Sequence, residues 1–216
     1  MTPETADLTA EALRKAGALP RALPHFAHIT RYWDGEHRQF AARLLPGEYY
    51  VSISGEVITT LLGSCISACI RDKILGIGGM NHFMLPNDAS HGTSAWASTV
   101  GSATRYGNVA MDKLIGDILQ LGGKRENLEV KLVGGAQVMA GNLAADIGAR
   151  NSAFIHQFLK DQGLPILAED LGDVYPRKVQ YFPRTGVIRV KKVAVVRNDA
   201  LIERENRYAK NLGRDA

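Results

Sequence analysis

The chain has 216 residues, of which 45% are hydrophobic and 22% charged, and its formal net charge is +4. These values are typical of a single folded domain, because domains commonly contain about 100–200 residues, and they argue against a disordered or fibrous protein. The basic residues are scattered and no apolar run is long enough to cross a bilayer. We therefore expect no nucleic-acid surface, no membrane insertion and a cytoplasmic location.

Residues 1–45 are predicted to form an N-terminal extension that is flexible in part. A short helix is expected between Ala6 and Leu19, and Pro20 and Pro24 interrupt the chain after it. The segment HFAHITRYWDGEHRQF that follows is polar and aromatic, with no clear helical or strand period. We therefore place the start of the main domain at residue 46.

Short β-type runs begin after Gly47. The segments EYYVSIS, EVITTLL, CISACI and ILGIGGMNHFML are rich in apolar, β-branched and aromatic residues, and turn signals separate them. Four strands with short connections are therefore expected here. The charged triplet Arg71-Asp72-Lys73 is predicted to be the turn between the third and the fourth.

Two helices and further strands are predicted in the second half. Apolar residues recur at three- and four-residue spacing from Ala103 to Leu121, which indicates a helix. LEVKLVGGA reads as a strand, GNLAADIGARNSAFIHQFLKDQG as a loop and a second helix, ILAEDLG as a strand, and VQYFPRTGVIRVKKVAVV as a hairpin. This order indicates an α+β or mixed α/β sandwich over residues 46–196, with helices against sheet, followed by a polar tail, 197–216.

A cysteine and a histidine are the strongest candidates for chemistry. If the strands on either side of Arg71-Asp72-Lys73 are adjacent, Cys65 and His82 lie at the same end of the pair. A thiol beside an imidazole can become a thiolate nucleophile, and the imidazole can return the proton to a leaving amine. The other cysteine, Cys69, is expected to pack in the core, because a free cysteine in a β run commonly behaves as a small hydrophobe.

Nearby residues fit the same chemistry. The absence of a side chain at Gly63 allows backbone to approach a bound group, and N–H groups near Ser64 and Cys65 are candidate oxyanion donors. Gly78 and Gly79 are expected to leave room for an extended substrate. On local pattern alone, Cys65 and His82 are equally compatible with two buried core residues.

Several motifs together resemble a known family. In order and spacing, LLGSC, IGGMNHFMLP, VKLVGGAQVM, IGARN and FPRTGVIRVKKV are similar to motifs of the CheD family of chemoreceptor glutamine deamidases. The likeness extends over most of the chain, from about Gly47 to Val196. It implies an αββα-like sandwich with a papain-like Cys-His site.

The resemblance also implies a function and a set of site residues. The protein would hydrolyse glutamine side-chain amides of methyl-accepting chemotaxis receptors to glutamate and ammonia, through a cysteine thioester and without a metal or organic cofactor. The family's cysteine falls on Cys65, its histidine on His82 and its threonine on Thr59. Since neighbouring residues of a strand point to opposite faces, only one of Thr59 and Thr60 can face the site. The family spacing favours Thr59.

The resemblance implies receptors as protein substrates and a CheC-type phosphatase as a possible binding partner. The sequence is also compatible with two other functions. The chain could be a chemotaxis binding module that docks receptors or such a phosphatase, or a papain-like methylesterase or peptidase, because thiol chemistry serves esters and amides alike.

Overall fold

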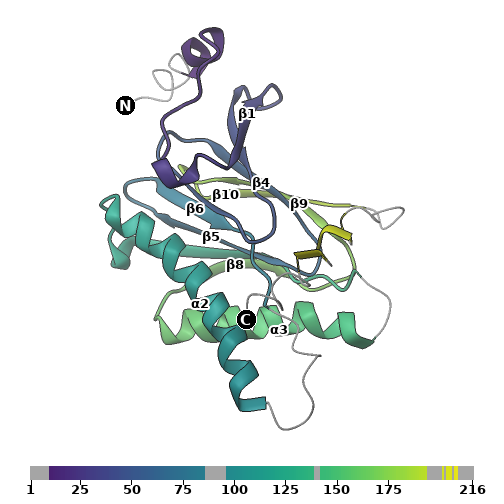
Figure 1. Ribbon diagram of the computed structural model, residues 1–216. Helices are drawn as coiled ribbons and strands as arrows, with labels where there is room; N and C mark the ends of the chain where they lie inside the picture. Colours follow the sequence, from purple (N-terminus) through teal and green to yellow (C-terminus); the bar gives the residue numbers. More distant parts are fainter. Residues whose placement is uncertain are drawn as a thin grey trace.

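The structure is a computed structural model that describes residues 10–85, 96–138, 142–193, 201, 203–205 and 207–208. One group of strands comprises β1 (Thr30–Asp34), β2 (Gln39–Arg43), β4 (Val57–Leu62), β9 (Arg177–Phe182) and β10 (Val187–Lys192). A second group comprises β3 (Tyr49–Ser52), β5 (Ile66–Asp72), β6 (Ile77–Asn81), β7 (Leu128–Gly134) and β8 (Ile166–Leu171). The two groups form five-stranded sheets with the orders β1-β2-β4-β9-β10 and β3-β6-β5-β7-β8 (Figure 1).

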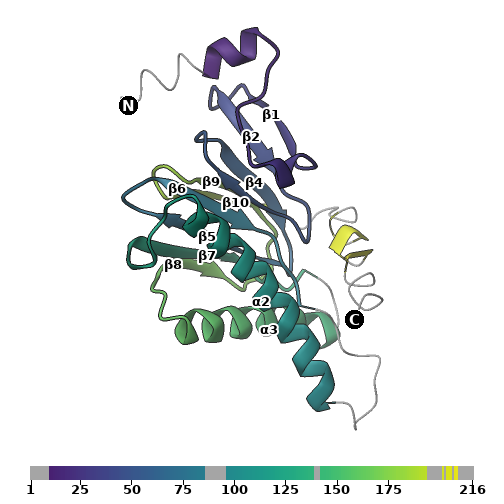
Figure 2. The same ribbon diagram turned by 60° about the vertical axis from the view of Figure 1, so that its left-hand side comes forward.

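Two long helices cover one side of this sandwich. They are α2 (Trp96–Gln120), which contacts β3, β5 and β6, and α3 (Asn142–Asp161), which contacts β5. Both lie on the outer face of the sheet that contains β5, as Figure 2 shows. Short 3-10 turns occur at η1 (Pro24–Phe26) and η2 (Arg125–Asn127), and residues 10–15 are helical.

The layer order differs from the expected αββα arrangement. Within the described ranges the layers are helix, sheet and sheet, with no long helix over the outer face of the β4-containing sheet (Figure 2). Most outer positions of β9 and β10 are polar or charged there, as Lys178 and Lys191 illustrate, although Val187 is an exposed apolar residue, so this face is largely suited to water. The mixed α+β sandwich itself is confirmed.

Most expected elements are present. The four strands after Gly47, the strand at β7 and the closing hairpin are confirmed. The helix expected from Ala103 begins earlier, at Trp96. The sequence pattern did not predict this start, because the first turns are rich in small residues and show no apolar period. The first nine residues, which include the start of the helix expected from Ala6, lie outside the described ranges.

Part of the N-terminal segment is built into a sheet. β1 and β2 form an antiparallel hairpin, and β2 pairs in parallel with β4, with Ala42 opposite Ile58. Residues 30–43 are therefore continuous with the sheet rather than separate from it. The division into residues 1–45, 46–196 and 197–216 stays a prediction.

Gly78 and Gly79 serve packing, not substrate room. A Cβ at Gly79 would lie 2.7 Å from Cδ1 of Leu114 on α2, and a Cβ at Gly78 would lie 2.5 Å from Cβ of Arg71. Both spaces are already filled by the helix and the neighbouring strand. The expectation that these glycines leave room for an extended substrate is therefore wrong.

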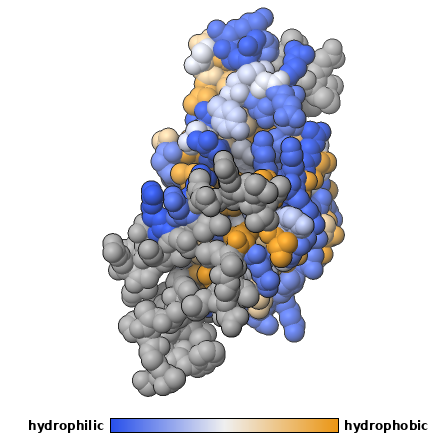
Figure 3. Space-filling model, turned by 90° about the vertical axis from the view of Figure 1, so that its right-hand side faces the viewer, coloured by the Kyte–Doolittle hydropathy of each residue, from blue (hydrophilic) through white to orange (hydrophobic). Residues whose placement is uncertain are grey.

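The described helices include none that is long and apolar enough to pass through a membrane. On the face shown in Figure 3, hydrophobic side chains occur in small groups among hydrophilic ones.

Asp72 at the end of β5 organises the turn to β6. It is fully buried, and its carboxylate accepts hydrogen bonds from the N–H groups of Ile74, Leu75 and Lys124. Burial alone would raise the pKa of Asp72, but these donors outweigh burial and hold the pKa below its usual value. A residue expected only as part of a charged turn is thus a structural anchor.

Replacing Asp72 with alanine should lower the free energy of unfolding by about 2–3 kcal/mol, because three backbone N–H groups lose a buried, charged acceptor. Because the folded pKa is depressed, the stabilisation is complete above the unfolded carboxyl pKa of about 3.9 and is lost as the pH falls through the folded value. Urea unfolding of the protein, Asp72→Ala and the exposed control Asp112→Ala at pH 7 and below pH 4 checks this. An equal loss of stability at both pH values would contradict it.

Candidate active site

Strand pairing brings Cys65 and His82 together. Ile66 and Phe83 form an antiparallel bridge in which each N–H donates to the other residue's carbonyl, at 3.0 and 2.9 Å. The residues that precede them in sequence, Cys65 and His82, lie on the same face of the two strands as diagonal neighbours. The two side chains expected from sequence to meet do so at one end of the β5–β6 pair.

The two groups are buried and close to a third. The sulfur of Cys65, a ring nitrogen of His82 and a carboxylate oxygen of Glu205 all lie within 4.8 Å of one another. Their exposed fractions are 0%, 1% and 1%. This distance permits proton transfer after small side-chain movements, since catalytic hydrogen bonds are often long without a bound substrate.

A threonine hydroxyl fixes the imidazole. Oγ1 of Thr60 lies 2.8 Å from Nδ1 of His82 and 2.9 Å from the carbonyl oxygen of Leu44. A hydroxyl has a single proton, and only donation satisfies the carbonyl, so Thr60 accepts from Nδ1–H of the neutral ring. The lone pair is then on Nε2, which is buried and has no hydrogen-bond partner in the described part of the chain. The ring therefore presents a base on the side away from Thr60.

Thr59, the residue favoured by the family spacing, has a different position. Because residues alternate along β4, Thr60 points between the sheets with Ile58 and Leu62, whereas Thr59 points to the opposite face. The structure thus brings together Cys65, His82 and Thr60, and it does not bring Thr59 to the imidazole.

The thiol and the imidazole are both uncharged in this arrangement. Burial raises the pKa of the Cys65 thiol well above its ordinary value, and the negative charge of Glu205 raises it further. Burial also lowers the pKa of His82 to about 3, with a smaller effect of the positive charge of Arg204. At neutral pH the described arrangement therefore holds a neutral pair, not a thiolate–imidazolium pair.

Two backbone N–H groups point into the site beside the thiol. The N–H groups of Gly63 and Ser64 donate to Oε1 and Oε2 of Glu205 at 2.8 and 2.9 Å, and the Ser64 hydroxyl donates to Oε2 at 2.8 Å. The two N–H groups bind different oxygens of one carboxylate, so together they form a binding site for a negatively charged group. Sequence reasoning located the donors near Ser64 and Cys65, one residue further along.

Glu205 and Asn151 are site residues that sequence reasoning missed. Asn151 on α3 is fully buried; its amide nitrogen donates to the carbonyl of Ser64, and its oxygen accepts from the N–H of Leu85. It therefore ties the turn before Cys65 to the segment that follows His82. The sequence feature that could have identified Glu205 is its spacing. It lies four residues after Leu201 and three before Tyr208, which places all three on one face of a helix.

A glycine turn supports the cysteine from the other side. The N–H of Gly135 donates to the carbonyl of Cys65 at 2.8 Å, and the N–H of Ala136 donates to that of Gly63 at 2.9 Å. A Cβ at Gly134, where φ is +122°, would lie 2.2 Å from the carbonyl oxygen of Cys65. Only glycine permits this approach, so the GG pair of VKLVGGA is a packing feature of the site.

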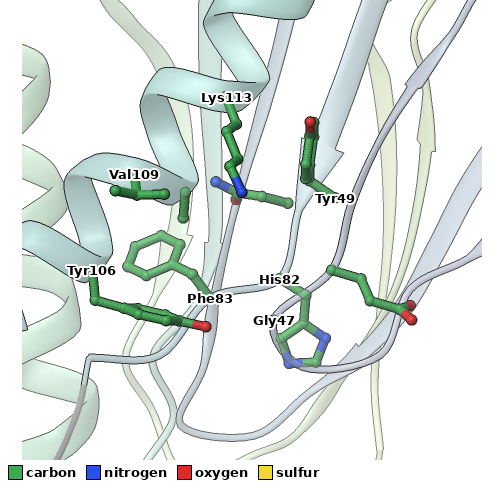
Figure 4. A pocket seen from close by; sticks show the side chains of 10 residues that line it. Gly47, Tyr49, His82, Phe83, Tyr106, Val109 and Lys113 are labelled. Carbon is green, nitrogen blue, oxygen red and sulfur yellow. The ribbon is translucent and has the colours of Figure 1, made fainter. Parts of the chain in front are cut away.

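An open pocket of about 120 Å³ adjoins His82. Its wall is formed by the chain around Gly47 and by side chains of α2, among them Tyr106, Val109 and Lys113 (Figure 4). The Tyr106 ring points from α2 toward the imidazole in this view. Its lining combines apolar side chains with one basic residue, Lys113, and one acidic residue, Glu48.

The cysteine, histidine and carboxylate are also donor types found in zinc sites. A second group of possible ligands in the described ranges is Asp34, Glu36 and His37, near the protein surface. In the first group both oxygens of Glu205 already accept hydrogen bonds from N–H or O–H groups. The geometry there is that of a hydrogen-bonded carboxylate beside a neutral thiol.

Comparisons with known proteins identify the family of this chain. Residues 84–192 match the family described as CheD chemotactic sensory transduction. A relative from Halorhodospira halophila, named probable chemoreceptor glutamine deamidase CheD, is 52% identical over 91% of this chain and 91% of its own length. Relatives of the same name from Herminiimonas arsenicoxydans and Methylobacillus flagellatus are 49% and 50% identical, over 87% and 84% of this chain and 90% and 88% of theirs. The chain belongs to the CheD family.

Proposed function

We propose that this protein is a glutamine deamidase of methyl-accepting chemotaxis receptors, with Cys65 as nucleophile, His82 as general base and acid, and Thr60 as the positioning residue. The observation that carries the proposal is the cluster of Cys65 and His82 beside the N–H groups of Gly63 and Ser64. The names of the relatives support the same activity and do not favour a pure binding module, a methylesterase or a peptidase.

The first half of the reaction forms a thioester. The Cys65 sulfur attacks the carbonyl carbon of a glutamine side chain while Nε2 of His82 takes the thiol proton. The N–H groups of Gly63 and Ser64 hold the oxygen on which negative charge develops, and removing one such donor typically costs about 10²–10³-fold in rate. His82 then gives its proton to the departing nitrogen, and ammonia leaves.

The second half releases glutamate. His82 accepts a proton from water, the resulting hydroxide attacks the thioester carbon, and the Cys65 sulfur leaves and regains a proton. The water supplies the new carboxyl oxygen, so one amide and one water give one carboxylate and one ammonium. Each conversion adds a negative charge to the receptor, which alters electrostatic repulsion between receptor helices.

Thr60 has a role distinct from that of the aspartate in many triads. A neutral hydroxyl that accepts from Nδ1–H selects the tautomer with a free Nε2 lone pair, yet it adds no negative charge that would raise the pKa of the imidazole. The ring is thus oriented and left as a neutral base. We further propose a cytoplasmic location and a CheC-type phosphatase as a binding partner, as the family resemblance implies.

The direct test uses a purified receptor cytoplasmic fragment and peptide mass spectrometry. Incubation with the protein should convert specific glutamines to glutamates, with a mass increase of about 1 Da and release of ammonia, whereas Cys65→Ala should leave them unchanged. Cys69→Ala is the matched control, because Cys69 is equally buried but lies within β5, and it should retain conversion. Conversion by Cys65→Ala at the original rate would refute the nucleophile.

A second prediction separates the two threonines. Thr60→Val should lower the deamidation rate about 10- to 100-fold, because general acid–base catalysis contributes about 10²–10⁴-fold and a misoriented imidazole loses part of it. Thr59→Val should leave the rate within about twofold, since its side chain points away from His82.

The readouts for this pair are the rate as a function of pH and the melting temperature. For Thr60→Val we expect a changed pH profile together with the lower rate, which a purely structural defect would not produce, and Thr60→Ser should restore most activity. A larger loss of deamidation rate in Thr59→Val than in Thr60→Val would contradict the role of Thr60 and indicate that Thr59 positions the imidazole.

A further inference from the structure

The described residues between 201 and 208 are helical and turn one face to the body of the protein. These residues, 201, 203–205 and 207–208, are called the 201–208 segment below. Leu201 and Glu205 are buried and Tyr208 is half-buried, whereas Glu203 and Arg207 are exposed. Positions 201, 205 and 208 form one stripe of an α-helix. The yellow pieces of this segment lie beside the ends of the strands in Figures 1 and 2.

The buried stripe places a carboxylate in the donor site. Glu205 accepts from the N–H groups of Gly63 and Ser64 and from the Ser64 hydroxyl, and one of its oxygens is within 4.8 Å of the Cys65 sulfur. A Cβ at Gly63 would lie only 2.7 Å from Oε2 of Glu205. The close fit therefore depends on the missing side chain at Gly63.

The tyrosine at the end of the stripe fixes the segment to the pocket wall. The Tyr208 hydroxyl contacts the hydroxyl of Tyr106 on α2. A Cβ at Gly47 would lie 2.7 Å from the same Tyr208 oxygen, so the ring rests on the backbone of the turn that leads into β3. Gly47 also donates its N–H to the carbonyl of His82, so the tyrosine covers the chain beside the imidazole.

We propose that the 201–208 segment occupies the substrate site as a tethered product analogue, with the Glu205 side chain in the place of the glutamate that the reaction forms. This rests on the proposed function. A glutamate side chain is chemically the product of glutamine deamidation, and a helix is the form in which a receptor coiled coil presents its side chains. A receptor helix that reaches Cys65 must displace the segment first.

The state of the thiol agrees with an occupied site. Cys65 has an exposed fraction of 0%, and the nearby carboxylate contributes to the raised pKa of the thiol. Displacement of Glu205 removes that negative charge and exposes the sulfur, so both changes favour the reactive thiolate. The segment thus couples access to the nucleophile with its ionisation.

The first experiment asks whether the segment is held as a substrate would be. In Glu205→Gln, the side-chain amide takes the position of the carboxylate, so Cys65 should displace ammonia from it, and water should then release glutamate at position 205. Peptide mass spectrometry should show position 205 about 1 Da heavier with time. The change should be absent in Glu205→Gln with Cys65→Ala, and in the exposed control Glu203→Gln.

The second experiment measures thiol access and needs no deamidase activity. Iodoacetamide labelling of Cys65 is followed in a Cys69→Ala background with a chelator present, which removes any metal that could shield the sulfur. If the segment covers the site in about nine of ten molecules, Cys65 is accessible in about one of ten. Cys65 in Glu205→Ala should then be labelled at least about 10-fold faster than in the parent. Glu203→Ala should label at the parent rate.

The outcomes distinguish this inference from the proposed function. Equal labelling of Glu205→Ala and the parent would overturn occupancy of the site, even if receptor glutamines are converted. If Glu205→Gln converts receptor glutamines but keeps its own introduced amide unchanged, the product-like pose is overturned. A third outcome is faster labelling of Glu205→Ala with conversion of neither the introduced amide nor receptor glutamines. This result would support a segment that covers Cys65 and would overturn the deamidase function.

Discussion

The positions of Cys65 and His82 depend on two backbone hydrogen bonds between Ile66 and Phe83. They extend the β5–β6 pairing past the end of β6, at the point where β5 begins, and so hold Cys65 and His82 on one face of adjacent strands. From this face His82 reaches across the sandwich to Thr60 on β4 of the other sheet. The site therefore requires both sheets in register, and a one-residue slip of either strand would turn a site residue to the opposite face.

Sequence reasoning identified the parts of the site that are local in the chain. Cys65 directly precedes β5 and His82 directly follows β6, and a short turn joins these strands, so strand pairing alone predicts that the two residues meet. The choice between Thr59 and Thr60 was not local, because it depends on which face of β4 packs against the second sheet. Family spacing favoured Thr59, and the structure places Thr60 against the imidazole. The αββα layer order was implied by the family resemblance, and in the described ranges both long helices instead contact the same sheet.

The remaining site residues come from distant segments. Asn151 is 87 residues from Ser64, and Glu205 is 141 residues from the same turn. The spacing of Leu201, Glu205 and Tyr208 is compatible with one helical face, but it does not predict that Glu205 would accept from two backbone N–H groups of a distant turn. With Glu205 in place, the thiol and the imidazole are both neutral and closed off from solvent. Substrate entry, thiol ionisation and release of the 201–208 segment are in this way parts of one event.

The most direct measurement of the central claim is trapping of the Cys65 thioester with hydroxylamine. A receptor helix peptide that contains a target glutamine is incubated with the protein and excess hydroxylamine, and its products are identified by mass spectrometry. A thioester predicts a hydroxamate at that glutamine, formed at the expense of glutamate and absent with Cys65→Ala, because the amine competes with water for the acyl group. Conversion to glutamate with no hydroxamate at saturating hydroxylamine would mean direct hydrolysis and would contradict covalent catalysis by Cys65.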